Sequence, residues 1–543
     1  MAMRLYSLGY LDTIFISMRP WTRRSLLHAL EQSAPAIQAD QNQQAMEIYA
    51  KLMDYLQTEV PGPAGTTSTA MTRGTVYGVE SLYARAMGIT GLSLRDSYHL
   101  GQTIVNDYGR PYEPGFNAIA GFSTLNEWGR FSLYVRGEYQ HAPSAAGYSY
   151  GLSQYLSTID EIPWSGYNIP QATIPYGPLA SVNTFALQEA VLSFHLLGHE
   201  ISGGKSDAWL GPAEGGAMAW SDNAQDIYSF RINRVEAMHI PYFTWLFGGL
   251  RYDFFVGSLK GHTFPNSPWV HSEMFSLRPT DNFEFSFQRT VIWGGEGHEP
   301  VTLHTFLRSF FSLQDTESAP ATKNSPLDPG ARFSDFSFSW RLPWLRHYVT
   351  LYTDSEAHDD VSPISAPRRA AYRPGVYLAQ FPKIPKLDLR VEASNTDCST
   401  LRCIGGVFQY FEAIQRNGYT NKGFLFGDWV GREAKAGNAA LTYHLSANEW
   451  VRFEYLHKQI PQDFIASGTT QNQYQFDVVK RLARNLELNA WYQHERWVAP
   501  VYKTGPQHDN VITFQLNFYP KLHSTPAVGL NGKVQSAAPV QQP

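Results

Sequence analysis

The segment 281–295, DNFEFSFQRTVIWGG, alternates aromatic and polar residues over its first half. The aromatic positions are Phe283, Phe285 and Phe287, and the polar positions between and after them are Glu284, Ser286 and Gln288. Because successive side chains of a β-strand point to opposite faces, one face of this strand is aromatic and the other is polar. In a soluble sandwich the aromatic face would pack into a core. In a membrane barrel it would face lipid, and the polar face would line the lumen.

The same two-residue period recurs from about Thr72 to the end of the strand-like region. It is clear in RFSLYVRGEYQ (130–140), RFSDFSFSWRL (332–342) and ITFQLNF (512–518). Tight polar turns join some of the strands, at NEWG (126–129), PTDN (279–282), SANE (446–449) and ARN (483–485). Other connections are long and irregular, at 143–183, 205–227, 293–330 and 355–374. Short turns at one end and long loops at the other are typical of an outer-membrane barrel.

The order of turns and loops supports a single closed sheet. Tracing the strands alternately up and down places all four tight turns at one end, where the last strand, 510–519, also finishes. We count roughly nineteen candidate strands, but bacterial barrels carry even numbers, so we expect about eighteen and one false assignment within 74–110. No linker interrupts 72–520, as separate soluble domains would require. Five tryptophans near strand ends are expected to form an interfacial girdle, namely Trp128, Trp293, Trp340, Trp450 and Trp497.

The two ends of the chain have a different character. PWTRRSLLHALEQS, with Thr22 as N-cap, and NQQAMEIYAKLMDYLQ, with Met46, Tyr49, Met53 and Leu56 on one side, predict amphipathic helices. We therefore expect three regions: a helical bundle on the periplasmic side (1–66), a barrel with long extracellular loops (67–522), and a disordered tail (523–543). The fold class is mainly β, a transmembrane antiparallel barrel with a small N-terminal α-helical bundle.

Composition limits the function and the compartment. The chain has 543 residues, a net charge of −5 and no basic cluster, which excludes a nucleic-acid footprint. No stretch reaches the roughly 18 apolar residues of a transmembrane helix. Cys398 and Cys403 are expected to form a disulfide, which indicates an oxidising compartment. The first residues, MAMRLYSLGYLDTIF, do not resemble a signal peptide, so an outer-membrane location implies a truncated start.

Three further segments carry a family resemblance. AWLGPAEGGAMAWSDNAQDIYSFRINR (208–234), FQRTVIWGGEGHEP (287–300) and RNGYTNKGFLFGDWVGREAKAG (416–437) resemble the capsule assembly Wzi family, as does GRPYEPGFNAIAGFS followed by GRFSLYVRGEYQHAP. The resemblance implies an outer-membrane barrel of about eighteen strands with periplasmic helices. It also implies a non-enzymatic, lectin-like function: holding capsular or other extracellular polysaccharide at the cell surface. A porin or solute-specific channel, with the same polar lumen, is the alternative.

Sugar recognition needs flat aromatic rings for stacking and planar polar groups for hydroxyls. The candidate polysaccharide-binding residues are Asp207, Trp209, Glu214, Trp220, Asp222, Asn223, Arg289, Glu296, His298, Asp428, Trp429 and Arg432. Arg289 and Arg136 are expected to point into the lumen, and glycines 203, 204, 211, 215 and 216 to let their loop fold tightly, even inward as a plug. Outer-membrane lipid is an expected partner, the helices could dock export machinery, and a monomer is expected.

Three patterns suggest other chemistry. GYSYG (147–151) matches the Gly-x-Ser-x-Gly elbow of hydrolases, with Ser149 as the nucleophile, but lies in a loop and not in an α/β sheet. DSEAHDD (354–360) could bind calcium, although a solvated loop is commoner. His298 beside Glu296 and Glu299 could activate water, but a Gly-rich loop whose polar groups are paired or wet is the favoured interpretation. We therefore expect no catalysis, no cofactor and no metal.

Overall fold

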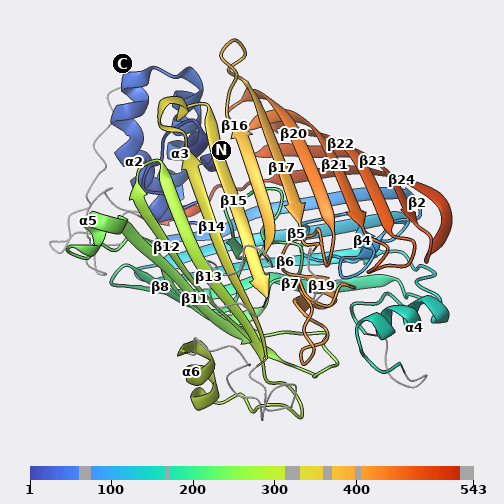
Figure 1. The fold of residues 1–543 in the computed structure, drawn as a ribbon. Helices are drawn as coiled ribbons and strands as arrows, with labels where there is room; N and C mark the ends of the chain where they lie inside the picture. The colour runs from blue at the N-terminus through green and yellow to red at the C-terminus, as the bar shows by residue number, and fades with distance from the viewer. Residues whose placement is uncertain (60–74, 165–170, 312–329, 359–369, 398–404, 526–543) are drawn as a thin grey trace.

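The computed structural model describes residues 1–59, 75–164, 171–311, 330–358, 370–397 and 405–525. Its main feature is a closed antiparallel barrel of 18 long strands, each hydrogen-bonded to the next, with the last closing on the first (Figure 1). The strands are β2 (Thr75–Gly91), β5 (Gly115–Trp128), β6 (Phe131–Ala142), β7 (Val182–Leu196), β8 (His199–Lys205), β10 (Tyr228–Arg234), β11 (Gly249–Ser258), β12 (Trp269–Thr280), β13 (Phe283–Trp293), β14 (Ala331–Arg341), β15 (Val349–His358), β16 (Ala371–Leu378), β17 (Leu387–Asn395), β20 (Lys435–Ser446), β21 (Glu449–Ile460), β22 (Thr469–Ala483), β23 (Leu486–Ala499) and β24 (Lys503–Phe518).

Strand β13 shows which face of the sheet is polar. Its residues Glu284, Ser286 and Gln288 are buried inside the barrel, whereas Phe287 is exposed on the outside. Phe287 pairs with Phe275 of β12 and with Phe336 of β14, which extends the aromatic surface across three strands. The aromatic face therefore points outward, as the membrane-barrel prediction requires.

The connections divide the barrel into two different ends. The four predicted tight turns all lie at one end, which we call the turn end, and the long connections lie at the other, the loop end. The loop end also carries 92–114 and 396–434, two long loops that the sequence pattern did not single out. Only one long strand, β2, lies within 74–110. The short strands β3 (Arg95–Asp96) and β4 (Gly101–Gln102) pair with each other inside a loop, which explains the surplus candidate.

The N-terminal region contains α1 (Ala2–Ser7), α2 (Arg23–Asp40) and α3 (Gln43–Glu59). Thr22 caps α2 as predicted, since its side chain accepts a hydrogen bond from Ser25 N. The buried stripe of α3 differs by one position from the predicted one: Ala45, Ile48, Leu52 and Leu56 are buried and Met46 is exposed. Residues 8–22 are not helical.

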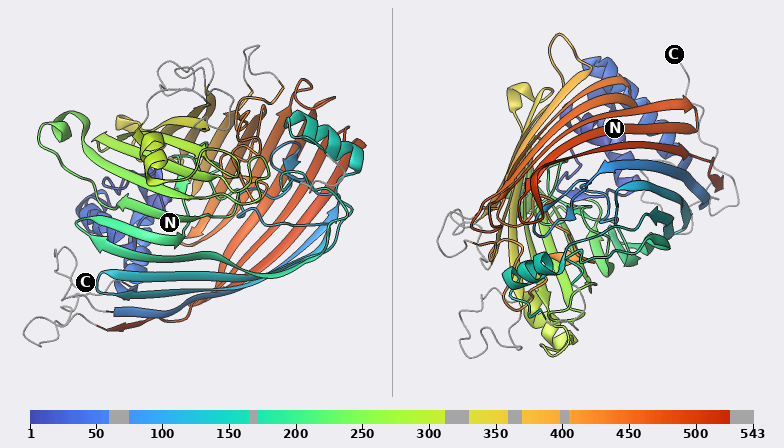
Figure 2. Two further views of the ribbon diagram at one scale, coloured as in Figure 1. Left: turned by 90° about the horizontal axis from the view of Figure 1, so that it is seen from below. Right: turned by 90° about the vertical axis from the view of Figure 1, so that its right-hand side faces the viewer.

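Residues 8–22 enter the barrel from the turn end, where the helices also lie (Figures 1 and 2). Arg4 pairs with Asp388 at the start of β17 (2.8 Å), and Arg341 of β14 pairs with Asp12 (2.6 Å). Further inside, β1 (Met18–Arg19) pairs with β9 (Trp209–Leu210), which belongs to a loop from the opposite end. Among the described residues, no helix is both long and apolar enough to cross a membrane.

The predicted tryptophan girdle is only partly correct. Trp128 and Trp340 are exposed on the outside near the turn end. Trp450 instead faces the lumen, where the Arg452 guanidinium lies 4.5 Å from its ring centroid. Trp497 is fully buried and donates to Leu92 O (2.9 Å). Trp293 is buried on the outer side beneath α6 (Leu303–Phe311), which packs against the wall and brings Phe306 to within 6.1 Å of the Trp293 ring.

The first residues of the expected C-terminal tail, 523–525, are ordered. β25 (His523–Thr525) pairs with the first residues of β2, so the chain is structured up to Thr525. Residues 526–543 lie outside the described residues, as do PGPAGT (61–66) and both cysteines of the expected disulfide, Cys398 and Cys403. The expected tail and disulfide therefore remain predictions.

Candidate functional site

Three loops from the loop end fold into the lumen and contact one another. They are residues 92–114, 206–227 and the described residues of the third loop, 396–397 and 405–434, and we call them together the plug. Tyr108 N donates to Asp222 O (2.6 Å), and Ser221 N donates to Phe426 O (2.7 Å). The ring centroids of Trp220 and Phe426 lie 4.3 Å apart. The plug therefore forms a hydrophobic core inside the barrel together with wall residues such as Phe255 and Phe333.

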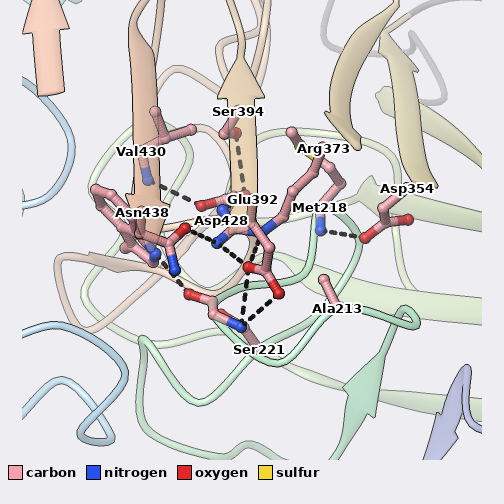
Figure 3. Close-up of polar contacts among 12 residues, drawn as sticks. Ala213, Met218, Ser221, Asp354, Arg373, Glu392, Ser394, Asp428, Val430 and Asn438 are labelled. Atoms are coloured by element: carbon pink, nitrogen blue, oxygen red, sulfur yellow. Dashed lines mark hydrogen bonds and ion pairs between the residues drawn. The ribbon is translucent and has the colours of Figure 1, made fainter. Parts of the chain in front are cut away.

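A fully buried arginine anchors the plug to the wall. Arg373 of β16 donates to Glu392 of β17 (2.8 Å) and to Asp428 of the plug (2.6 Å), as Figure 3 shows. Glu392 in turn accepts from Gly215 N (3.1 Å) and Glu214 N (3.2 Å). Arg373 thus pairs with two buried carboxylates, and Glu392 has Arg390 as a second cation at 3.6 Å. Asp428 belongs to one plug loop, and Glu392 binds another. We call Arg373, Glu392 and Asp428 the anchor node.

Close backbone approach to the wall explains the glycines of this segment. Met218 N donates to Asp354 of β15 (2.7 Å; Figure 3), and Trp429 Nε1 donates to Gly215 O (2.7 Å). A Cβ at Gly216 would lie 2.9 Å from Arg373 Nη1, and one at Gly215 would collide with Glu392. The loop folds inward as predicted, with Gly211, Gly215 and Gly216 close to other groups, whereas Gly203 and Gly204 belong to strand β8 and not to the loop.

A second charged cluster joins the plug to α4 (Tyr150–Ile159) of the loop 143–181. Arg432 is buried, donates to Asp160 (2.6 Å) and Gly406 O (2.7 Å), and lies 4.4 Å from the Tyr98 ring centroid. His99 lies between Asp160 and Asp96, 3.0 Å from each. Burial alone would lower the pKa of His99, but the two carboxylates overcome it and raise the pKa to about 9.

The plug is also attached to the N-terminal segment. Ile16 N and Ser17 N donate to Glu284 on the lumenal face of β13 (2.9 and 3.0 Å). Arg19 donates to Gly211 O (2.9 Å), and its guanidinium lies 5.0 Å from the Trp209 ring centroid. A continuous series of contacts therefore connects the helices at the turn end with the plug.

The loop end carries an aromatic surface cluster. Tyr150, Trp164 and Tyr176 make successive edge-to-face contacts at 5.6 and 5.5 Å, and Tyr150 is exposed. Beside them is a cavity of about 190 Å³. Its wall includes Tyr148, Tyr502 and the ion pair between Arg95 and Glu113. Aromatic rings and polar groups therefore lie together at this end of the barrel.

A family model described as capsule assembly protein Wzi matches residues 84–512, which is most of the chain. The chain belongs to the capsule assembly protein Wzi family. A search of the curated proteins found no match. This Wzi-family chain is accordingly an outer-membrane β-barrel.

A solved structure shows the same fold. The chain is similar to Escherichia coli Wzi, described as an outer-membrane protein involved in group 1 capsule assembly and a carbohydrate-binding β-barrel, with 13% identity, a TM-score of 0.66, and 96% of this chain and 98% of that chain covered. Pseudomonas aeruginosa OpdQ (10% identity, TM-score 0.42, coverage 83% and 98%) and Acinetobacter baumannii OccAB2 (10%, 0.42, coverage 82% and 98%) are more distant.

The structure divides the twelve candidate residues of this Wzi-family barrel into three groups. Six are buried within the plug: Trp209, Trp220, Asn223, Asp428, Trp429 and Arg432. Three are half-buried in the loop 206–227: Asp207, Glu214 and Asp222. The remaining three lie away from the plug: Arg289, Glu296 and His298. Nine of the twelve predicted residues thus lie together in the plug, but six of these nine are buried inside the protein.

Two of the half-buried carboxyl groups have well-defined surroundings. Glu214 accepts from Arg390 of β17 (2.8 Å). Burial raises the pKa of Asp222 well above its ordinary value, and the nearby charge of Asp207 raises it further.

Arg289 does not point into the lumen, so that expectation is wrong. It belongs to the same phase of β13 as Phe285 and Phe287 and lies on the outer face. Its Nε donates to Glu273 (3.0 Å), and its Nη2 donates to Ser309 O (3.4 Å) and to Phe310 O at the C-terminus of α6. Arg136, by contrast, is lumenal as predicted and pairs with Glu138 (3.2 Å).

The alternative chemical motifs acquire structural roles. Ser149 is the N-cap of α4, and its hydroxyl accepts from Leu152 N (3.3 Å) instead of lying at a strand–helix elbow. Strand β15 runs through most of DSEAHDD, where Asp354 and Glu356 face inward and bind Met218 N and Gln409. Asp359 and Asp360 lie outside the described residues. Burial lowers the pKa of His298, and Glu299 pairs with Arg308.

The wall residues that hold the plug were missed from the sequence. Arg373, Glu392 and Asp354 lie on the inward phase of β16, β17 and β15. A charged residue at a lumen-facing strand position was the available signal. That signal identifies a lumenal group, but it does not identify its partner, because Asp428 lies 55 positions away from Arg373.

Proposed function

We propose that the protein holds capsular or related extracellular polysaccharide at the cell surface through its loop end. Membership of the capsule assembly family and the fold shared with a carbohydrate-binding barrel support this function. The single observation that carries the proposal is the closed loop end, where the plug fills the lumen and aromatic groups lie at the surface. In outer-membrane barrels the long loops face the exterior and the short turns the periplasm. With this orientation, the proposal is that the helices lie in the periplasm and contact export machinery there.

The surface cluster Tyr150, Trp164 and Tyr176, with the adjacent cavity at Tyr148 and Tyr502, is the proposed contact area for the polymer. Flat rings stack on pyranose faces, and the Arg95–Glu113 pair offers donors and acceptors to hydroxyls. The buried tryptophans and arginines of the plug then have an indirect function: they hold these loops in place.

The experiment measures how surface polysaccharide partitions between cells and medium. In a strain without the gene, we expect total polymer to stay constant while the cell-attached fraction falls. The full chain should restore attachment, and the double variant Tyr150→Ala/Trp164→Ala should not. Trp344→Ala, which removes an exposed tryptophan at the turn end, is the matched control and should restore it. An unchanged partition in the deletion strain would contradict the proposed function.

A further inference from the structure

The lumen is not completely filled on the turn side of the plug. A cavity of about 330 Å³ lies against the inner face of β2 and β20–β23, with Arg85, Trp429 and Trp491 in its wall. A second cavity of about 320 Å³ shares Glu214, Arg390 and Arg452 with the first. The shared residues make the two cavities neighbours along one path, which we call the lumenal cavity. Each part is within the size range of small-molecule sites, about 300–1,000 Å³.

The lumenal cavity reaches the turn end of the barrel. The second part is lined by Met1, which is exposed, and by Asn448 in the turn between β20 and β21. The first part ends beneath the plug, at Trp429 and Asn106. A solute would therefore enter from the turn end and stop at the underside of the plug, on the opposite side from the surface cluster.

The wall chemistry is that of a sugar site. Trp491 offers a ring, and the first part also contains five carboxamide side chains, Asn106, Asn438, Gln473, Gln475 and Gln493. A carboxamide both donates and accepts hydrogen bonds, as a sugar hydroxyl does. Three arginines and four acidic residues also line this part, Arg85, Arg390, Arg452, Asp107, Glu214, Glu454 and Asp477. The nearly balanced charge does not favour a simple anion or cation.

Several polar atoms of the wall have no protein partner among the described residues. Asn106 Oδ1 and Asp477 Oδ2 are buried and accept no hydrogen bond there. Arg452 donates from Nε to Thr442 (3.2 Å) and forms no ion pair within the described chain. An unsatisfied buried polar group costs about 1–3 kcal/mol, so these atoms point to a ligand with its own donors and acceptors.

We propose that the lumenal cavity is a second glycan subsite, which takes a short segment of the same polymer from the turn end, on the periplasmic side, before that polymer reaches the surface. The proposal rests on the proposed function, since it assigns the same polymer to another part of the barrel. In this arrangement Trp491 supplies a stacking face, while the carboxamides and Arg452 bind hydroxyl groups. The surface cluster and the lumenal cavity are then separate sites on either side of the plug.

The test uses the full chain, folded in detergent micelles, and two labelled probes. One probe is the intact surface polysaccharide. The other is the set of di- and trisaccharides released from it by partial acid hydrolysis. Ala440→Phe places a ring in the lumenal cavity, and its control Ala439→Phe places the same ring on the outer face of β20. Trp491→Leu removes a cavity ring, and its control Tyr492→Leu removes an outward ring.

We expect the wild type and both controls to bind the short saccharides, and both cavity variants to bind them roughly tenfold more weakly or not at all. The variant Tyr150→Ala/Trp164→Ala should lose the intact polymer and keep the short saccharides. Unchanged binding in Ala440→Phe would overturn the inference, as would equal losses in Ala440→Phe and Ala439→Phe. If the wild type binds polymer but no short saccharide, the inference fails and the proposed function stands. If it binds neither probe, the proposed function fails as well.

Discussion

At the residue scale, Arg373 determines whether the plug can stay in the lumen. Replacing it by Met leaves Asp428 buried without an ion-pair partner and leaves Glu392 with only Arg390, 3.6 Å away. Removing one partner of a buried ion pair costs about 3–5 kcal/mol. We expect Arg373→Met to unfold at a lower temperature, measured by the heat-dependent shift in gel migration. Arg496→Met is the control, because Arg496 lies exposed on the outer phase of β23. Identical unfolding temperatures for Arg373→Met and the wild type would contradict the role of the anchor node.

His99 should make the loop end sensitive to pH. Its folded-state pKa of about 9 is above the ordinary value of 6.5, so its contribution to stability is complete below pH 6.5 and is lost as pH rises through about 9. We expect His99→Gln to unfold at a lower temperature than the wild type below pH 6.5, and the difference to shrink towards pH 9 and above. A difference that stays constant over this range would show that the proton on His99 does not contribute.

At the scale of elements, α6 is held to the outer wall by a charge at its C-terminus. The guanidinium of Arg289 donates to Ser309 O and Phe310 O, and such a cation contributes up to about 2 kcal/mol in a partly buried setting. We expect Arg289→Ala to speed hydrogen exchange in 303–311 while the plug and polymer binding stay unchanged. Loss of polymer binding with normal exchange in α6 would instead assign Arg289 to the glycan site.

At the scale of the whole molecule, the plug should make the barrel electrically closed. Three loops fill the loop end of the lumen and are bound both to the wall and to the N-terminal segment. We expect almost no conductance when the wild type is inserted in a planar bilayer, and frequent openings for Arg373→Met. A steady open current through the wild type would favour the channel alternative over a closed, glycan-holding barrel.

The sequence by itself determined the barrel, the placement of its tight turns and its two amphipathic N-terminal helices. These properties depend on local periodicity, which a single sequence displays. The inward and outward phases were also available: Glu284 and Phe287 lie as the alternation predicts. The same alternation assigns Arg289 to the outer face. Arg289 was nevertheless expected in the lumen, since a charged side chain on the outer face needs a partner. That partner is α6, and only the folded protein brings it next to Arg289.

Only the tertiary structure decided how the lumen is closed. The plug loops have no repeating pattern, and their contacts join residues far apart in the chain, such as Met218 with Asp354 and Arg432 with Asp160. The tryptophans of these loops could equally have faced lipid, polymer or a core. A barrel this wide leaves an open lumen unless loops fold into it. Here they do, and Trp220, Phe426 and their neighbours are buried in a hydrophobic core inside the lumen.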